Sequence, residues 1–123
     1  MIWIGVVLAG GAGAVLRFLV DRAVARRAAR SLPFAGMPFG TLVVNISGAA
    51  LLGLLGSLAL SRYTALLAGT AFVGSYTTFS TWMLETQRLS EERQVRNAVA
   101  NIVVSIVLGI GAALFGQWIA GRL

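Results

Sequence analysis

The sequence predicts an all-α membrane protein with four transmembrane helices in a single domain, residues 1–123, and two observations carry this prediction. The first is composition: 58% of the residues are hydrophobic and 11% are charged, whereas a soluble domain carries about 25% charged residues. The second is the presence of four apolar runs, each close to or above the ~20 residues that a helix needs to cross a hydrocarbon core of about 30 Å. These runs are residues 2–20, 39–60, 64–84 and 95–119.

The first run is rich in small residues. Gly5, Ala9 and Gly13 are four residues apart, a spacing that lets two helix backbones approach closely in lipid. Its single charged residue is Arg17, near its end. No basic residue precedes the run, so we do not expect it to be a cleaved signal peptide. An Arg-rich polar spacer, residues 21–38, is expected to follow.

The second run contains Asn45 and pairs Gly53 with Ser57 at the same spacing of four. A tight turn, residues 61–63, leads into the third run, whose stretch "GSYTTFSTW" (residues 74–82) has hydroxyl groups on six of nine side chains. Gly is a weak helix former, and Ser and Thr side chains can replace backbone hydrogen-bond partners. We therefore predict that the third helix is broken near its middle, where freed carbonyls could bind a small cation.

The fourth run places Asn97, Asn101 and Ser105 four residues apart, hence along one helix face. Such residues commonly form hydrogen bonds between helices, but together with Asn45 and the hydroxyl-rich stretch they favour a continuous polar track. Neutral hydrogen-bond donors suit an anion, as do the positive edges of aromatic rings such as Phe79 and Trp82. Gly109 and Ala113 repeat the small-residue spacing.

Several functional classes fit the sequence poorly. There is no Cys and no His, so a Ser nucleophile would lack an evident base and an enzyme is not expected. The alternative function is a small four-helix multidrug or cation exporter. Proton-coupled transport usually needs an ionisable group within the membrane, and here all four carboxylates lie at span ends or in spacers, namely Asp21, Glu85, Glu91 and Glu92.

Three segments, taken in order on four spans, resemble the Fluc/CrcB family of fluoride channels along nearly the whole chain. They are "GGAGAVLRF", "GTLVVNISG" and "GSYTTFSTWMLE". The resemblance implies a channel in the cell membrane that exports cytoplasmic fluoride passively and so lowers its toxicity. It also implies an antiparallel dimer with two pores and a structural sodium ion at its centre, which is needed but not transported.

The resemblance also implies roles for individual residues. The main-chain carbonyls of Gly74 and Thr77 would bind sodium, and Arg17 would lie near the aqueous entrance of the pore. The remaining residues would line the fluoride pathway: Asn45, Thr78, Phe79, Ser80, Thr81, Trp82, Asn101 and Ser105. Trp82 departs from the family pattern, which usually has a second Phe there, so its role stays open.

The distribution of Arg predicts the orientation of the chain. With four spans, the first and third spacers share one side of the membrane, and basic residues in short loops stay cytoplasmic. Seven Arg lie on that side against two on the other, which predicts a fixed orientation with both termini outside. Because the family's dimer is antiparallel, we expect the partner to be a homologue inserted the other way, with a homodimer as the alternative. The seven are Arg22, Arg26, Arg27, Arg30, Arg88, Arg93 and Arg96, and the two are Arg62 and Arg122.

Overall fold

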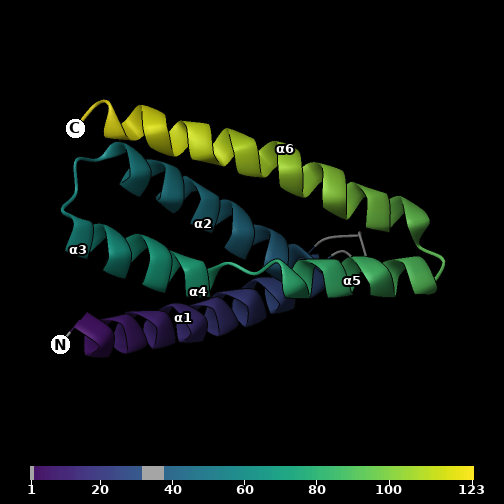
Figure 1. The fold of residues 1–123 in the computed structure, drawn as a ribbon. Helices are drawn as coiled ribbons and strands as arrows, with labels where there is room; N and C mark the ends of the chain where they lie inside the picture. Colours follow the sequence, from purple (N-terminus) through teal and green to yellow (C-terminus); the bar gives the residue numbers. More distant parts are fainter. Residues whose placement is uncertain (1, 32–37) are drawn as a thin grey trace.

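The computed structural model describes residues 2–31 and 38–123, and every secondary-structure element in these residues is helical. Figure 1 shows the chain running back and forth along one axis, with both termini and the turn between α2 and α3 at the same end. The elements are α1 (Ile2–Ser31), α2 (Phe39–Ser57), α3 (Arg62–Ala65), the π-helix η1 (Leu66–Val73), α4 (Gly74–Tyr76), α5 (Ser80–Glu91) and α6 (Val95–Ala120).

Three of these helices are long and apolar enough to cross a membrane, over Ile2–Arg30, Phe39–Ser57 and Val95–Ala120. The third expected span does not form one helix, because the chain from Arg62 to Glu91 is divided among α3, η1, α4 and α5. The first of these segments begins at a capped end, where the Ser61 hydroxyl accepts a hydrogen bond from the Thr64 N–H at 3.2 Å. Residues 2–31 and 38–123 are therefore all-helical, with three helices that are long and apolar enough to cross a membrane.

The first spacer is shorter than the sequence predicts. Residues 21–31 continue α1 instead of forming a polar loop, because Ala and Arg, which dominate this segment, are strong helix formers. At 1.5 Å per residue the helix is about 45 Å long, which exceeds a hydrocarbon core of about 30 Å. Residues 32–37 of the expected spacer lie outside the described residues.

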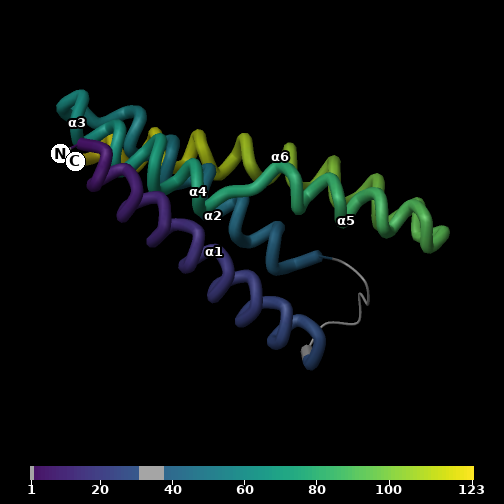
Figure 2. Tube along the Cα trace, turned by 60° about the horizontal axis from the view of Figure 1, so that its bottom comes forward, coloured from purple at the N-terminus to yellow at the C-terminus, as the bar shows by residue number. Residues whose placement is uncertain are grey.

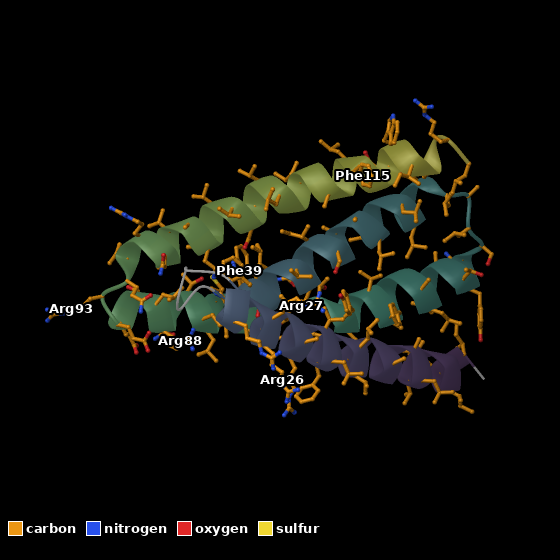
Figure 3. All side chains as sticks on the ribbon, turned by 180° about the vertical axis from the view of Figure 1, so that it is seen from behind. Arg26, Arg27, Phe39, Arg88, Arg93 and Phe115 are labelled. Carbon is orange, nitrogen blue, oxygen red and sulfur yellow. The ribbon has the colours of Figure 1, made fainter. Side chains whose placement is uncertain are left out.

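The charged spacer expected at residues 85–94 is also mostly helical, since α5 continues to Glu91. The turn that follows contains Arg93, whose φ of 60° is left-handed. Figure 3 shows Arg88 and Arg93 at the end of the bundle away from the C-terminus, whereas Phe115 lies toward the C-terminal end.

Much of the apolar surface faces outward. Trp3, Val7 and Leu8 on α1 are each more than 65% exposed, as is Phe79 beside α5, and much of α6 is similarly uncovered. A soluble monomer rarely exposes apolar patches of this extent. The surface is instead suited to lipid or to another apolar protein surface.

Glycines permit the closest helix contacts. A Cβ at Gly53 of α2 would collide with the Ala113 carbonyl of α6, and one at Gly116 of α6 would collide with the Ala50 carbonyl of α2. Gly13 of α1 lies in the same way against the Phe72 carbonyl of η1. These contacts confirm close packing at Gly53 and Gly13. The interpretation of Gly109 as a packing residue is wrong within one chain, because a Cβ there would have no neighbour within 4 Å among the described residues.

The helices form two groups that share α2. The α1 helix packs against α2, η1 and α4, whereas α6 packs against α2 and α5. Figure 2 shows α1 diverging from α5 and α6 toward the end of the bundle opposite the termini. The interruption between α4 and α5 lies where the two groups begin to separate.

Candidate functional site

The centre of the site is a short non-helical segment, residues 77–79, between α4 and α5. Thr77 ends α4 with an extended backbone, at φ −83° and ψ 163°. Its hydroxyl donates to the Val73 carbonyl at 3.1 Å, which also accepts from the Thr77 N–H at 3.0 Å. Both donors of Thr77 thus bind the same carbonyl, and α4 ends there.

Asn45 of α2 holds this segment through both ends of its carboxamide. Its Nδ2 donates to the Thr78 carbonyl and its Oδ1 accepts from the Thr78 N–H, both at 2.8 Å. A backbone group left unpaired inside a membrane costs several kcal/mol. Asn45 therefore makes the interruption tolerable, by replacing the helical partners that Thr78 has lost.

The Thr78 side chain starts the next helix. Its Oγ1 accepts from the Thr81 N–H at 3.1 Å and lies 3.4 Å from the Ser80 Oγ. This is the function of an N-cap, in which a side-chain oxygen satisfies an otherwise free N–H in the first turn. The hydroxyl-rich composition of the stretch thus serves in part to end one helix and begin another.

Because Asn45 and the Thr78 hydroxyl accept these hydrogen bonds, two main-chain carbonyls lose the N–H partners that they would have in a continuous helix. In an uninterrupted helix, Gly74 would accept from the Thr78 N–H and Thr77 from the Thr81 N–H. The first N–H donates to Asn45 instead, and the second donates to the Thr78 hydroxyl. The described residues contain no cluster of His, Cys, Asp or Glu that could bind a metal. Main-chain oxygens are nevertheless ligands that hard cations accept, so the carbonyls of Gly74 and Thr77 fit a small cation.

Two cavities meet at this segment. A groove of about 690 Å³ runs along α2 and the interrupted span, and a smaller cavity of about 210 Å³ lies against α1. Thr78 lines both, and among residues 2–31 and 38–123 it is the only one that they share. The groove contains seven of the predicted site residues, namely Asn45, Gly74, Thr77, Thr78, Phe79, Trp82 and Ser105.

The smaller cavity brings Arg17 together with Thr78 and Thr81, and also contains Asp21 and Thr41. Arg17 thus shares a cavity with Thr78 and Thr81 of the hydroxyl-rich stretch and with Asp21 of the first spacer. Ser80 and Asn101 line neither cavity. Ser80 is exposed, and Asn101 is buried between α5 and α6.

The two aromatic residues of the stretch pack edge to face. Phe79 and Trp82 have ring centroids 5.6 Å apart and ring planes at 80°, a favourable arrangement because a positive ring edge meets a negative face. Phe79 is 69% exposed and lines the groove. Most of the Phe79 ring surface is thus left uncovered in the groove, apart from its contact with Trp82.

The polar residues of α6 are more enclosed than a water-filled track would need. Asn101 is 1% exposed, and its Nδ2 donates to the Thr86 hydroxyl at 2.9 Å. The Oδ1 of Asn101 and the Oγ of Ser105 are buried without a hydrogen-bond partner in the described residues. Asn97 instead donates to the Gln94 side chain at 2.9 Å, near the start of α6.

Sequence reasoning missed two residues that contribute to the site. Thr86 contacts Asn101, and its position four residues after Trp82 was the available signal. Tyr76 is buried at 4% exposure and its hydroxyl lies 2.9 Å from the Ser47 hydroxyl. That contact joins α4 to α2 two residues before the Thr78 backbone meets Asn45.

Comparison with known proteins identifies the family. The family described as CrcB-like protein, Camphor Resistance (CrcB), matches residues 4–117. A protein of Mycobacterium tuberculosis named fluoride-specific ion channel FluC 2 is 71% identical over 119 residues, which cover 97% of this chain and 90% of that protein.

Two further relatives carry similar names. The FluC 2 protein of Mycolicibacterium paratuberculosis is 73% identical over 97% of this chain and 93% of its own length. The fluoride-specific ion channel FluC 1 of Leifsonia xyli is 40% identical over 98% of this chain and 88% of its own length. These names describe ion channels, which are not enzymes. The resemblance seen in the three sequence segments is confirmed: this chain belongs to the CrcB family.

Proposed function

We propose that this chain forms a fluoride-specific ion channel that lets cytoplasmic fluoride leave the cell passively through the plasma membrane. The observation that carries this proposal is the position of Thr78, which separates a cavity containing Arg17 from a groove containing Phe79. An anion attracted by the Arg17 guanidinium would meet hydroxyl groups next and then an exposed aromatic ring. The names of the relatives supply the identity of the anion.

The groups beyond Arg17 are suited to a small, strongly hydrated anion. Thr78, Thr81 and Phe79 offer hydroxyl groups and a ring edge, which can replace part of a hydration shell without fixed charge. Conduction needs binding that is favourable enough for entry and weak enough for exit. Neutral donors meet this requirement better than a buried Lys or Arg inside the pore.

Passive export is energetically sufficient. Hydrogen fluoride is a neutral weak acid that crosses membranes, and it ionises in a near-neutral cytoplasm, where the anion is trapped. An inside-negative potential of 100 mV supplies ~2.3 kcal/mol per charge, which is roughly fifty-fold in concentration at ~1.4 kcal/mol per decade. No coupled proton is needed for accumulation to be prevented.

The decisive experiment is fluoride efflux from liposomes that contain the purified protein. We expect rapid efflux in the absence of a pH gradient, with little chloride leak. A requirement for a pH gradient, or equal chloride flux, would contradict the channel and favour the multidrug or cation exporter.

A matched pair of variants tests the pathway in the same assay. Phe79→Ile removes the exposed ring beside the groove and should lower flux by about tenfold or more, since each ~1.4 kcal/mol on a barrier is tenfold in rate. Phe115→Ile is the control, because Phe115 is also exposed but lines neither cavity. Equal flux in the two variants would remove Phe79 from the proposed pathway.

We also propose that the carbonyls of Gly74 and Thr77 bind a structural sodium ion. Their loss of helical N–H partners supports this proposal. The ion would stabilise the interruption and would not itself be transported. Prolonged dialysis into a sodium-free buffer with a large organic cation should therefore slow fluoride flux and lower the melting temperature, and sodium should restore both. Indifference to sodium in both measurements would contradict the site.

We propose that the groove receives the second chain of an antiparallel dimer. Gly56 and Gly69 line it, and a Cβ at either would meet nothing within 4 Å in the described residues of one chain. Small residues on an exposed apolar face allow a second chain to approach closely. Because Gly74 and Thr77 line the same groove, a partner packed there would bring a second set of carbonyls near the first.

The charge bias supports a fixed orientation with both termini outside, and hence a partner that is a homologue inserted the other way. The chain has no Cys, so Leu123→Cys would introduce a unique thiol at an exposed position. In cells that express this chain alone, we expect labelling from outside only. Equal labelling from the two sides would instead support a homodimer of oppositely inserted copies.

A further inference from the structure

Three hydrogen bonds form a closed circuit, in which two bonds join α5 to α6 and the third lies within α5. The Trp82 indole N–H donates to the main-chain carbonyl of Asn101 at 3.3 Å. The Asn101 side-chain amide donates to the Thr86 hydroxyl at 2.9 Å, and that hydroxyl donates to the main-chain carbonyl of Trp82 at 2.9 Å. The circuit therefore begins and ends at Trp82.

The burial of the three residues protects the hydrogen bonds of the circuit from water. Asn101 is 1% exposed, and Trp82 and Thr86 are half-buried, so water competes weakly for their polar atoms. Within the circuit each residue donates one hydrogen bond and accepts one, whereas the Asn101 Oδ1 lies outside it, buried and without a partner in the described residues. Phe79 is outside the circuit but packs on it, through its edge-to-face contact with the Trp82 ring.

The circuit also accounts for an indole at this position. A Phe ring could make the edge-to-face contact with Phe79, but it has no N–H to donate to α6. The single N–H of Trp82 is already used by the Asn101 carbonyl. It is consequently not offered to an ion in the groove, although the ring itself lines the groove.

We infer that Trp82 is a positioning residue: with Thr86 and Asn101 it fixes the spacing of α5 and α6 and holds the Phe79 ring at the groove. The part of this inference that concerns flux rests on the proposed fluoride channel. The part that concerns the circuit does not, and the two can be measured separately.

Indole hydrogen exchange tests the circuit without any transport assay. The chain has three Trp, and Trp3 and Trp118 are 74% and 56% exposed, so they serve as internal controls. In protein labelled with ¹⁵N-tryptophan and reconstituted in detergent micelles, the Trp82 indole N–H should exchange with deuterium more slowly than the other two. Its resonance is assigned by its disappearance in Trp82→Phe.

Thr86→Val and Thr86→Ser separate the circuit from simple burial. Val matches the shape of Thr but lacks the hydroxyl, so Trp82 indole exchange should accelerate roughly fivefold, the ratio expected for one hydrogen bond, while Trp3 and Trp118 stay unchanged. Ser keeps the hydroxyl and should retain slow exchange. Unchanged exchange in Thr86→Val would overturn the circuit.

Fluoride flux in the same proteins tests the positioning role. Thr86→Val should lower flux severalfold, Thr86→Ser should restore it, and Trp82→Phe should behave as Thr86→Val does. Faster indole exchange with undiminished flux would overturn the positioning role and leave a purely structural contact. Absence of fluoride flux in the unmodified protein would instead contradict the proposed function, and the exchange measurements would still decide the circuit.

Discussion

The contact between α2 and α6 and the interruption between α4 and α5 are held together in opposite ways. Where α2 meets α6, Gly53 and Gly116 have no side chain, so each backbone lies directly against the other helix. At the interruption, the side chains of Asn45 and Thr78 take the place of missing backbone partners. The first region depends on space, and the second depends on specific polar atoms.

This difference indicates how each region should respond to substitution. A packed helix contact fails when atoms are added, because neither backbone can move without losing its other contacts. A polar interruption fails when atoms are removed, because an unpaired backbone group in lipid is costly. The two regions can therefore be distinguished by whether added volume or a lost hydrogen bond damages them.

The largest effect should come from adding volume between α2 and α6. Gly116→Val would force a side chain into the Ala50 carbonyl and the Leu54 amide. Overpacking typically costs about 1–3 kcal/mol, and more against rigid backbone, so we expect loss of the folded, monodisperse protein on size-exclusion chromatography. Gly111→Val is the control, since a Cβ there meets nothing within 4 Å in the part of the chain that the structure describes. Normal folding of Gly116→Val would show that this contact is not rigid.

A smaller effect on stability, but a full effect on transport, is expected at Asn45. Asn45→Asp keeps an acceptor for the Thr78 N–H and loses the donor to the Thr78 carbonyl, which should cost about 1–3 kcal/mol. The protein should stay folded with a lower melting temperature and no fluoride flux. Asn45→Leu removes both partners and should melt lower still. Equal melting temperatures for Asn45→Leu and the unmodified protein would exclude Asn45 as the support of the interruption.

The smallest effect tests which exposed face receives a partner. Gly111→Ala should be neutral or stabilising by about 0.5–1 kcal/mol, because Ala favours helix over Gly. Gly56→Ala is equally unhindered in one chain but lines the groove, so it should weaken the dimer in a subunit-exchange or cross-linking measurement. The same dimer stability for both variants would place the partner on another face.

The spans and the site segments could be predicted from the sequence because they depend on local composition. Apolar runs gave three of the long helices, and the hydroxyl-rich stretch pointed to the segment that contains Thr78. The end of α1 differs from the prediction, because the Arg-rich residues 21–31 of the expected spacer continue the helix, and Arg and Ala both favour helix.

The partners within the site could not be predicted in the same way. Asn45 and Thr78 are 33 residues apart, and Thr86 and Asn101 are 15 apart. Only the tertiary arrangement brings them together. Residue types indicated that hydrogen bonds would form there, but they did not indicate which atoms would form them or that Trp82 would use its indole N–H.

The interruption also has a consequence for how the chain enters the membrane during synthesis. The helical stretch before the interruption, α3, η1 and α4 together, has 4, 8 and 3 residues, and α5 after it has 12. Neither part is long enough to cross a bilayer alone, since about 20 residues are needed. The exposed backbone of Thr78 becomes acceptable in lipid only after Asn45 reaches it. Because Asn45 precedes Thr78 along the chain, it leaves the ribosome first. The Asn45 side chain of the second span is then available to form hydrogen bonds with the Thr78 backbone when the third span is released. The order of synthesis thus matches the order in which the polar groups need each other.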